Sequence, residues 1–176
     1  MKNRLKNYSE KGLKEISQHT DKSRNIILIS IKSNWYKLIK KGVKTVEIRR
    51  NFTNYEWRGE ILYFYVASPI KKILGWTIAN SGFEYPIDEA WEKFKDKSAI
   101  SERKFKEYTK GKKKIFCIEI NDKIHDVDLD ITDFGIKHPP QNYMYLFNME
   151  TDFIKRSNEE IWVEEEILEK ARMDNE

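Results

Sequence analysis

Cysteine, histidine and glycine are scarce in this sequence, and each shortage excludes a class of site. The chain has one cysteine, Cys117, three histidines and seven glycines among 176 residues. A single cysteine cannot form an internal disulfide, which favours a reducing compartment, so we expect a cytoplasmic protein. The histidines stand far apart, with no cysteine or aspartate at ligand spacing. We therefore expect neither a metal site nor a bound cofactor.

Long apolar runs and phosphate-binding loops are also missing. No apolar run approaches the roughly 18 residues that span a membrane. The basic residues 1–25 lack the apolar core of a secretory signal. No glycine-rich loop follows a predicted strand, and there is no Gly-x-Ser-x-Gly elbow. These absences argue against a membrane protein, a secreted protein, a nucleotide hydrolase of the phosphate-loop type and a catalytic triad.

The composition is that of a folded domain with a heavily charged surface. Hydrophobic residues make up 39% of the chain and charged residues 35%, a balance typical of a globular protein. The net charge of +4 is uneven, because residues 1–25 carry +4 and residues 157–176 carry −6. The basic centre suits a nucleic acid partner. A solvated lysine-rich surface would explain the same lysines.

Alternation and helical spacing predict an α+β fold built on a mixed, partly closed β-barrel of about six strands, with short inserted helices and a C-terminal helix. Strands are expected at 25–31, 44–50, 60–67, 71–79, 114–120, 124–131 and 143–149, and helices at 11–18, 33–41, 86–95, 101–108 and 157–172. We expect three parts: a basic flexible arm (1–24), the domain (25–150), and an acidic C-terminal helix packed on or flanking it (151–176).

Residues 41–50 are the most informative segment. Strand alternation places Thr45, Glu47 and Arg49 on one face, opposite Val46 and Ile48. If the two apolar residues enter the core, the other face presents a hydroxyl, a carboxylate and a guanidinium in a row. The pattern alone is also compatible with a surface strand carrying an ordinary ion pair of little energetic value.

The segment Gly42–Arg49 resembles the Gly-x-Lys-x-x-Glu-x-Arg signature of ASCH domains, which are PUA-like β-barrel domains associated with RNA binding and RNA metabolism. The resemblance continues through Ile29–Lys32, which is similar to the first strand of the family, and Tyr65–Pro69, which is similar to the first of its paired central strands and the turn after it. Pro139–Tyr143 resembles a Pro-Pro-Gln segment found after the barrel in one microbial branch. Together these segments cover about residues 26–147.

The resemblance implies a cleft between barrel and helices, lined by Lys44, Glu47 and Arg49. Arginine offers a planar fork for a phosphate or a base edge, and a carboxylate accepts from a base amino group. The candidate binding residues are Lys32, Trp35, Lys44, Thr45, Glu47, Arg49, Arg50, Ser68, Gln141 and Tyr143. Unpaired bases stack on aromatic rings, and the aromatic candidates for this role are Trp35, Tyr55, Trp57 and Tyr143.

Some relatives that the sequence resembles are enzymes. One branch hydrolyses acetylated cytidine with a lysine and a threonine of the signature and a distant glutamate. Lys44 matches that lysine, but Glu47 stands where the threonine would be. The distant glutamate has only Glu84, Glu89 and Glu102 as conceivable equivalents. Other members are ribonucleases, and for an enzyme of either kind the candidate catalytic residues are Lys44, Glu47, Arg49 and Tyr143.

The run Lys110–Lys114 holds four lysines in five residues. It is either a solvated turn before a strand or a patch that contacts phosphates. Taken together, the sequence predicts a nucleic-acid-binding module, for single-stranded or modified RNA before DNA. The alternatives are an enzyme, either a ribonuclease or a nucleoside amidohydrolase, and a module that binds a nucleotide or another small ligand. No membrane partner is expected.

Overall fold

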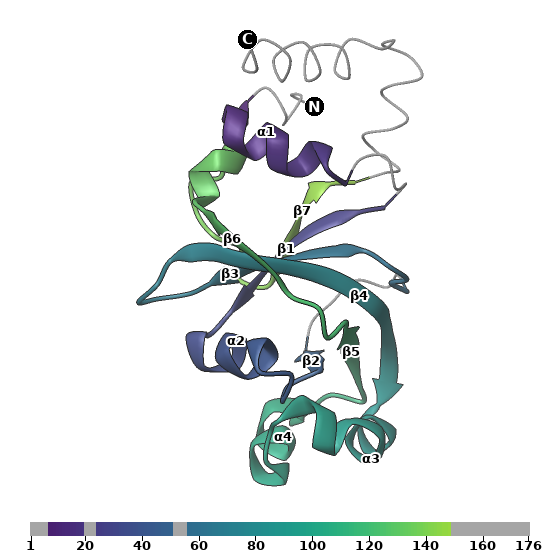
Figure 1. Ribbon diagram of the computed structural model, residues 1–176. Helices are drawn as coiled ribbons and strands as arrows, with labels where there is room; N and C mark the ends of the chain where they lie inside the picture. Colours follow the sequence, from purple (N-terminus) through teal and green to yellow (C-terminus); the bar gives the residue numbers. More distant parts are fainter. Residues whose placement is uncertain (1–6, 20–23, 51–55, 149–176) are drawn as a thin grey trace.

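The computed structural model describes residues 7–19, 24–50 and 56–148. Within these residues, seven strands form one mixed sheet in the order β2-β5-β4-β3-β1-β7, with β6 paired to β4 (Figure 1). The strands are β1 (Ile26–Ile31), β2 (Val46–Arg49), β3 (Ile61–Val66), β4 (Lys72–Pro86), β5 (Lys114–Ile120), β6 (His125–Leu129) and β7 (Tyr143–Phe147). Among the described strands, only β1 and β3 pair in parallel. No ladder joins the end strands β2 and β7 in this part of the chain, so the barrel is not closed.

The long strand β4 joins the two halves of the sheet. Its first half pairs with β3 and β6, and its second half pairs with β5. The register shifts between Ala79 and Ser81, where the strand passes from one half to the other. The sequence predicted a strand end here, because Asn80, Ser81 and Gly82 are turn formers. Instead the strand bends, and a side chain at Gly82 would meet the ring of Phe116 at 2.9 Å.

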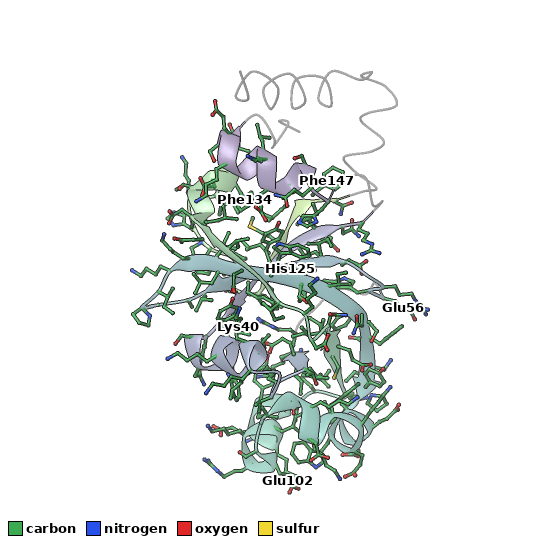
Figure 2. The ribbon with its side chains drawn as sticks, viewed as in Figure 1. Lys40, Glu56, Glu102, His125, Phe134 and Phe147 are labelled. Atoms are coloured by element: carbon green, nitrogen blue, oxygen red, sulfur yellow. The ribbon has the colours of Figure 1, made fainter. Side chains whose placement is uncertain are left out.

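The helices sit at the two ends and on one flank of the sheet. They are α1 (Glu10–Ser17), α2 (Ser33–Lys40), α3 (Ile87–Ser98), α4 (Glu102–Thr109) and the 3-10 turn η3 (Ile131–Phe134). Figure 1 shows α1 and η3 at one end and α3 and α4 at the other. Figure 2 shows the same arrangement in side chains, with Phe134 and Phe147 near the first end and Glu102 at the tip of the second.

Three apolar clusters follow this layout. The central one, with Ile29 and Phe64, lies under α2, and a second, with Leu28 and Tyr63, lies under α1 and η3. Neighbouring residues of β1 and β3 therefore face different clusters, which explains why both strands are apolar along their whole length. The third cluster, which includes Phe105, packs α3 and α4 against β2 and β5.

Residues 7–19 belong to the domain. Ser9 donates its backbone N–H to the Asp133 carbonyl at 2.9 Å, and the Tyr8 hydroxyl donates to the Leu146 carbonyl at 2.8 Å. Ile16 is buried in the second cluster. These residues of the expected basic arm therefore pack against the domain, because an apolar face on α1 has a partner that the local sequence does not reveal. The predicted acidic helix at 151–176 lies outside the described residues.

Candidate functional site

A cleft of about 720 Å³ opens between the sheet and α4. Its walls come from the end of β1 and the start of α2, from β2, from the chain after β3, from α4 and from the loop before β7. The deepest charged residues on its lining are Lys44, Glu47 and Arg49, whose side chains are 5%, 10% and 11% exposed. This buried ion array forms the floor of the cleft.

Lys44 is held entirely by the protein. Its ammonium donates to the carbonyls of Val46 at 2.7 Å and Ser98 at 2.9 Å, and lies 3.1 Å from a carboxylate oxygen of Glu47. An ammonium has three N–H groups, so these three acceptors use all of them. The same nitrogen lies 5.2 Å from the ring centre of Trp35, within cation–π range. Lys44 therefore ties the start of β2 to the end of α3.

Arg49 bridges strands that share no ladder. Its guanidinium donates from Nη2 to the Ser30 carbonyl of β1 at 2.7 Å and from Nη1 to the Asn142 side-chain oxygen at 3.1 Å. Asn142 directly precedes β7. The Nε atom lies 2.9 Å from Glu47, a close ionic contact in which the N–H is not aligned as a hydrogen bond. Arg49 thus connects β2 to the far end of the strand order.

Glu47 lies between the two cations. Burial by itself would raise the pKa of this carboxyl, but the Lys44 ammonium and the Arg49 guanidinium outweigh burial and lower the pKa. Each carboxylate oxygen contacts one cation, Oε2 facing Lys44 and Oε1 facing Arg49. The floor is therefore an ionised array with one net positive charge.

The structure brings six of the predicted binding residues to the cleft and leaves four elsewhere. On its lining are Lys32, Trp35, Lys44, Glu47, Arg49 and Gln141. Lys32 and Gln141 are exposed, and Trp35 is half-buried. These side chains come from three separate segments, 32–35, 44–49 and the chain at Gln141, which the fold gathers around the β2 strand.

The four that do not line the cleft are Thr45, Arg50, Ser68 and Tyr143. Thr45 precedes β2, and its backbone bonds to Lys97 and Ile120. The exposed Arg50 donates to the Lys110 carbonyl at 2.9 Å, and Ser68 sits in an exposed turn. Strand alternation was applied correctly to Glu47 and Arg49, but the strand begins after Thr45 and ends before Arg50.

The predicted stacking residues lie in different environments in the structure. Tyr143 packs edge-on against Trp57, with ring centres 6.0 Å apart, and Trp57 is 1% exposed in the central cluster. Trp57 therefore serves the core rather than a surface platform. Tyr55 lies outside the described residues. Of the three conceivable catalytic glutamates, Glu84, Glu89 and Glu102, each is exposed and none lines the cleft.

One wall of the cleft was not predicted from the sequence. Lys104, Glu107 and Tyr108 of α4 line it, together with Ile100 in front of the helix. The helix itself was predicted, and its N-cap is Ser101, whose hydroxyl accepts from the Lys104 N–H. Which face of α4 meets β2 depends on the apolar contacts of Phe105, so the cleft-facing side of the helix could not be predicted from the local sequence.

Metal and nucleophile chemistry find no support in the described ranges. Among residues 7–19, 24–50 and 56–148, no group of three His, Cys, Asp or Glu side chains is placed to hold a metal ion. Burial raises the pKa of the Cys117 thiol to about 12, so this buried side chain is a core thiol and not a nucleophile. No helix in the described part of the chain is long and apolar enough to cross a membrane.

Solved structures share this fold. An ASCH protein from Zymomonas mobilis, crystallised as a serine-to-alanine variant, matches with a TM-score of 0.64 at 20% identity, covering 75% of this chain and 95% of that one. A tyrosine-to-phenylalanine variant gives 0.64 at 20% identity, covering 74% and 96%. A further structure of ASCH from this organism gives 0.63 at 20% identity, covering 72% and 91%. A comparison with curated proteins finds no match.

The α+β fold, a mixed sheet with short helices, is therefore shared with these ASCH structures and agrees with the fold class predicted from the sequence. The sequence model of the ASCH domain matches residues 29–124, more than half of the chain. The chain belongs to the ASCH domain family. Members of this family are in general PUA-like RNA-binding modules, which agrees with the class predicted from the signature.

Proposed function

We propose that this ASCH domain binds single-stranded or modified RNA in the cleft floored by Lys44, Glu47 and Arg49. The observation that carries the proposal is the lining of the cleft. A buried, internally paired ion array forms its floor, and exposed lysines and an aromatic ring surround it. The volume of about 720 Å³ is within the range of small-molecule sites, which suits one or two unpaired nucleotides.

The rim supplies the contacts with RNA in this proposal. Lys32 follows β1, Lys104 lies on α4, and both are exposed on the cleft lining. Lysine ammonium groups in these positions neutralise phosphates, which is the main source of affinity for a nucleic acid backbone. Trp35 offers an aromatic face to a base, and the Gln141 amide can donate to and accept from a base edge.

Binding is favoured over hydrolysis by the state of Lys44. A lysine that acts as base, nucleophile or oxyanion donor needs an N–H or a lone pair free for the substrate. The three acceptors around its ammonium leave no N–H free. Tyr143, another of the four candidate catalytic residues, is not on the cleft lining. We therefore expect no turnover of acetylated cytidine or of labelled RNA.

The test is equilibrium binding of a labelled single-stranded RNA at several salt concentrations. We expect the logarithm of affinity to fall linearly with the logarithm of salt, because phosphate contacts release counterions. The variants Lys32→Ala and Lys104→Ala should each weaken binding and reduce the salt slope by about 0.7, the value for one lost contact to a single strand. Neither residue forms an ion pair within the described residues, so folding should not change.

The matched control is Lys14→Ala, an exposed lysine of α1 at the opposite end of the molecule (Figure 1). This variant should bind as tightly as the parent protein. The proposal is wrong if the double variant of Lys32 and Lys104 binds RNA with unchanged affinity and slope. Hydrolysis of acetylated cytidine or RNA that persists through purification, and disappears in a Lys44→Met variant that circular dichroism shows to be folded, would support the enzymatic alternative instead.

A further inference from the structure

The faces of α4 have different roles. Phe105 is buried in the third apolar cluster, and Thr109 is also buried. Lys106 and Glu102 form an ion pair at 2.6 Å on the solvent side. Arg103 lies 4.0 Å from Glu107, which itself lines the cleft. Lys104 and Tyr108 stand four residues apart, so they are neighbours on the remaining face. Both line the cleft.

Tyr108 is an exposed aromatic ring with a fixed position. It is 39% exposed, one of three large apolar side chains that remain exposed within the described residues. Its hydroxyl accepts a hydrogen bond from the Arg50 backbone N–H at 3.1 Å. This bond to the residue after β2 holds the tip of the ring beside the cleft. A fixed ring loses little conformational entropy when a flat ligand stacks on it.

The basic run begins beside this ring. The Arg50 side chain donates to the Lys110 carbonyl at 2.9 Å, so one residue holds both Tyr108 and the start of the loop. The chain then turns at Gly111, which has a φ of +77°. Every lysine from Lys110 to Lys114 is exposed. The 110–114 loop thus begins with a concentrated positive charge close to Tyr108, a residue on the cleft lining.

We infer that Tyr108 and the 110–114 loop form a second subsite, continuous with the cleft, for the next nucleotides of an unpaired nucleic acid strand. The Tyr108 ring stacks one base, and Lys110 and Lys113 contact the phosphates that follow it. An aromatic platform beside a positively charged groove is the common design of single-strand binding surfaces. A duplex would satisfy the lysines but leaves no free base face for Tyr108. The inference rests on the proposed function, because the strand must first enter the cleft.

The test compares a trinucleotide with an oligonucleotide of about 12 residues, a length that covers a typical single-strand site. The longer RNA should bind more tightly to the parent protein. The Lys110→Ala/Lys113→Ala variant should bind the trinucleotide normally, lose the gain from length, and reduce the salt slope of the longer RNA by about 0.7 for each contact. Tyr108→Ala should bind the longer RNA roughly five- to 150-fold more weakly.

Two controls separate stacking and charge from folding. Tyr108→Phe keeps the ring but loses the bond to Arg50, so it should bind the longer RNA more weakly than the parent protein and more tightly than Tyr108→Ala. Lys14→Ala/Lys123→Ala removes two exposed lysines elsewhere and should leave the length gain intact. Polyglutamate with the same net charge as the longer RNA should compete poorly with labelled RNA for the protein. If it competes as well as the unlabelled longer RNA does, the inference is overturned, because stacking requires a base.

The failures of the two proposals are distinguishable. If neither RNA binds the parent protein, the proposed function is wrong and the second subsite falls with it. If both RNAs bind through Lys32 and Lys104 while the Lys110/Lys113 variant keeps the full gain from length, the cleft stands and the second subsite is wrong. A Tyr108→Ala variant with unchanged affinity for the longer RNA overturns the stacking role alone.

Discussion

Three charged side chains lie side by side at the floor of the cleft, and each is held by backbone or side-chain atoms of the protein itself. Removing a charge from water costs several kcal/mol, and the cost is offset only when its partners are complete. Lys44 has two carbonyls and a carboxylate, and Arg49 has a carbonyl, an amide oxygen and the same carboxylate. The signature residues therefore line the cleft and also stabilise the fold around it.

Lys44→Met should destabilise the domain strongly. Breaking a buried ion pair from one side leaves unpartnered groups behind and typically costs about 3–5 kcal/mol. Here the Ser98 and Val46 carbonyls would lose a donor, and Glu47 would keep only Arg49. Urea unfolding measures the change. Lys41→Met, at an exposed position three residues earlier, is the control and should stay within about 0.5 kcal/mol. Equal effects of the two substitutions would contradict the buried array.

Glu47 should make the domain sensitive to acid. Its pKa is lowered in the folded state from an ordinary value of 4.5. The carboxylate therefore contributes stability that is complete above the unfolded pKa and is lost as pH falls through the folded pKa. Near neutral pH, the contribution of Glu47 to the free energy of unfolding should not change with pH. This contribution should decrease as the pH falls below 4.5. Glu47→Gln should be less stable at neutral pH and should lose less on acidification, as urea unfolding at a series of pH values will show. Parallel pH profiles would refute this.

At the scale of elements, Arg49 connects β2 to the β7 end of the sheet, two strands that no ladder joins in the described residues. β2 and β7 end the strand order, and the guanidinium reaches from β2 to the Ser30 carbonyl and to Asn142. Arg49→Lys keeps the charge but cannot reproduce a planar fork with donors in two directions. We expect a loss of about 1–3 kcal/mol, the cost of acceptors left without a donor. Urea unfolding is the measurement, and Arg50→Lys is the neighbouring exposed control. A lysine variant as stable as the control would show that the bridge contributes nothing.

The packing of α1 against η3 depends on the absence of a side chain at Gly12. Alanine is favoured over glycine inside a helix by about 1 kcal/mol, which by itself predicts a stabilising substitution. A side chain at Gly12, however, would lie 2.0 Å from the Asp133 carbonyl oxygen, and moving the backbone to relieve such overpacking costs about 1–3 kcal/mol. We expect Gly12→Ala to destabilise.

The docking of α1 can be followed directly. The Ser9 N–H donates to the same Asp133 carbonyl, so its hydrogen exchange should accelerate in Gly12→Ala. Lys14→Ala, on an exposed position of the same helix, should leave that exchange unchanged. Slower exchange and higher stability in Gly12→Ala would mean that helix propensity outweighs the contact.

Most elements could be read from the sequence, and the misses have physical causes. β5 was predicted with its exact bounds, since its apolar run is closed by turn residues on both sides. β4 was predicted too short, because Asn80 and Gly82 are turn formers and the local sequence cannot tell a bend within a strand from its end. A helix was expected at 11–18 and lies at Glu10–Ser17. Its docking was not expected, since that depends on contacts more than 100 residues away in the chain.

The candidate site was predictable where it follows one strand and not where it depends on packing between elements. Glu47 and Arg49 share a face by alternation, and the structure keeps them together. Their burial was not predictable, because it requires α4 and the loop before β7 to close over them. Lys104 and Tyr108 were missed for the same reason: a helix has several polar faces, and only tertiary contacts choose among them.

At the scale of the whole molecule, β4 couples the two ends. Its first half lies over the cluster beneath α1 and η3, and its second half carries the sheet toward α3 and α4 (Figure 1). The clusters beneath α1 and beneath α4 share no residue, yet each borders strands that pair with β4. A strand common to both should make the domain unfold as one unit, as small single domains usually do.

Conservative truncations at the two ends test this coupling. Ile61→Val lies in the cluster beneath α1 and Ile115→Val in the cluster beneath α4, and both side chains are 1% exposed. Each should cost about 0.5–1.5 kcal/mol, and the costs should add in the double variant because the sites share no contacts. Urea unfolding followed by near-UV and far-UV circular dichroism should give one transition in every variant, shifted but with unchanged slope. Val43→Ala, at a side chain that is 52% exposed, should shift nothing. Two transitions, of which only one moves in each single variant, would show that the ends unfold independently and that β4 does not couple them.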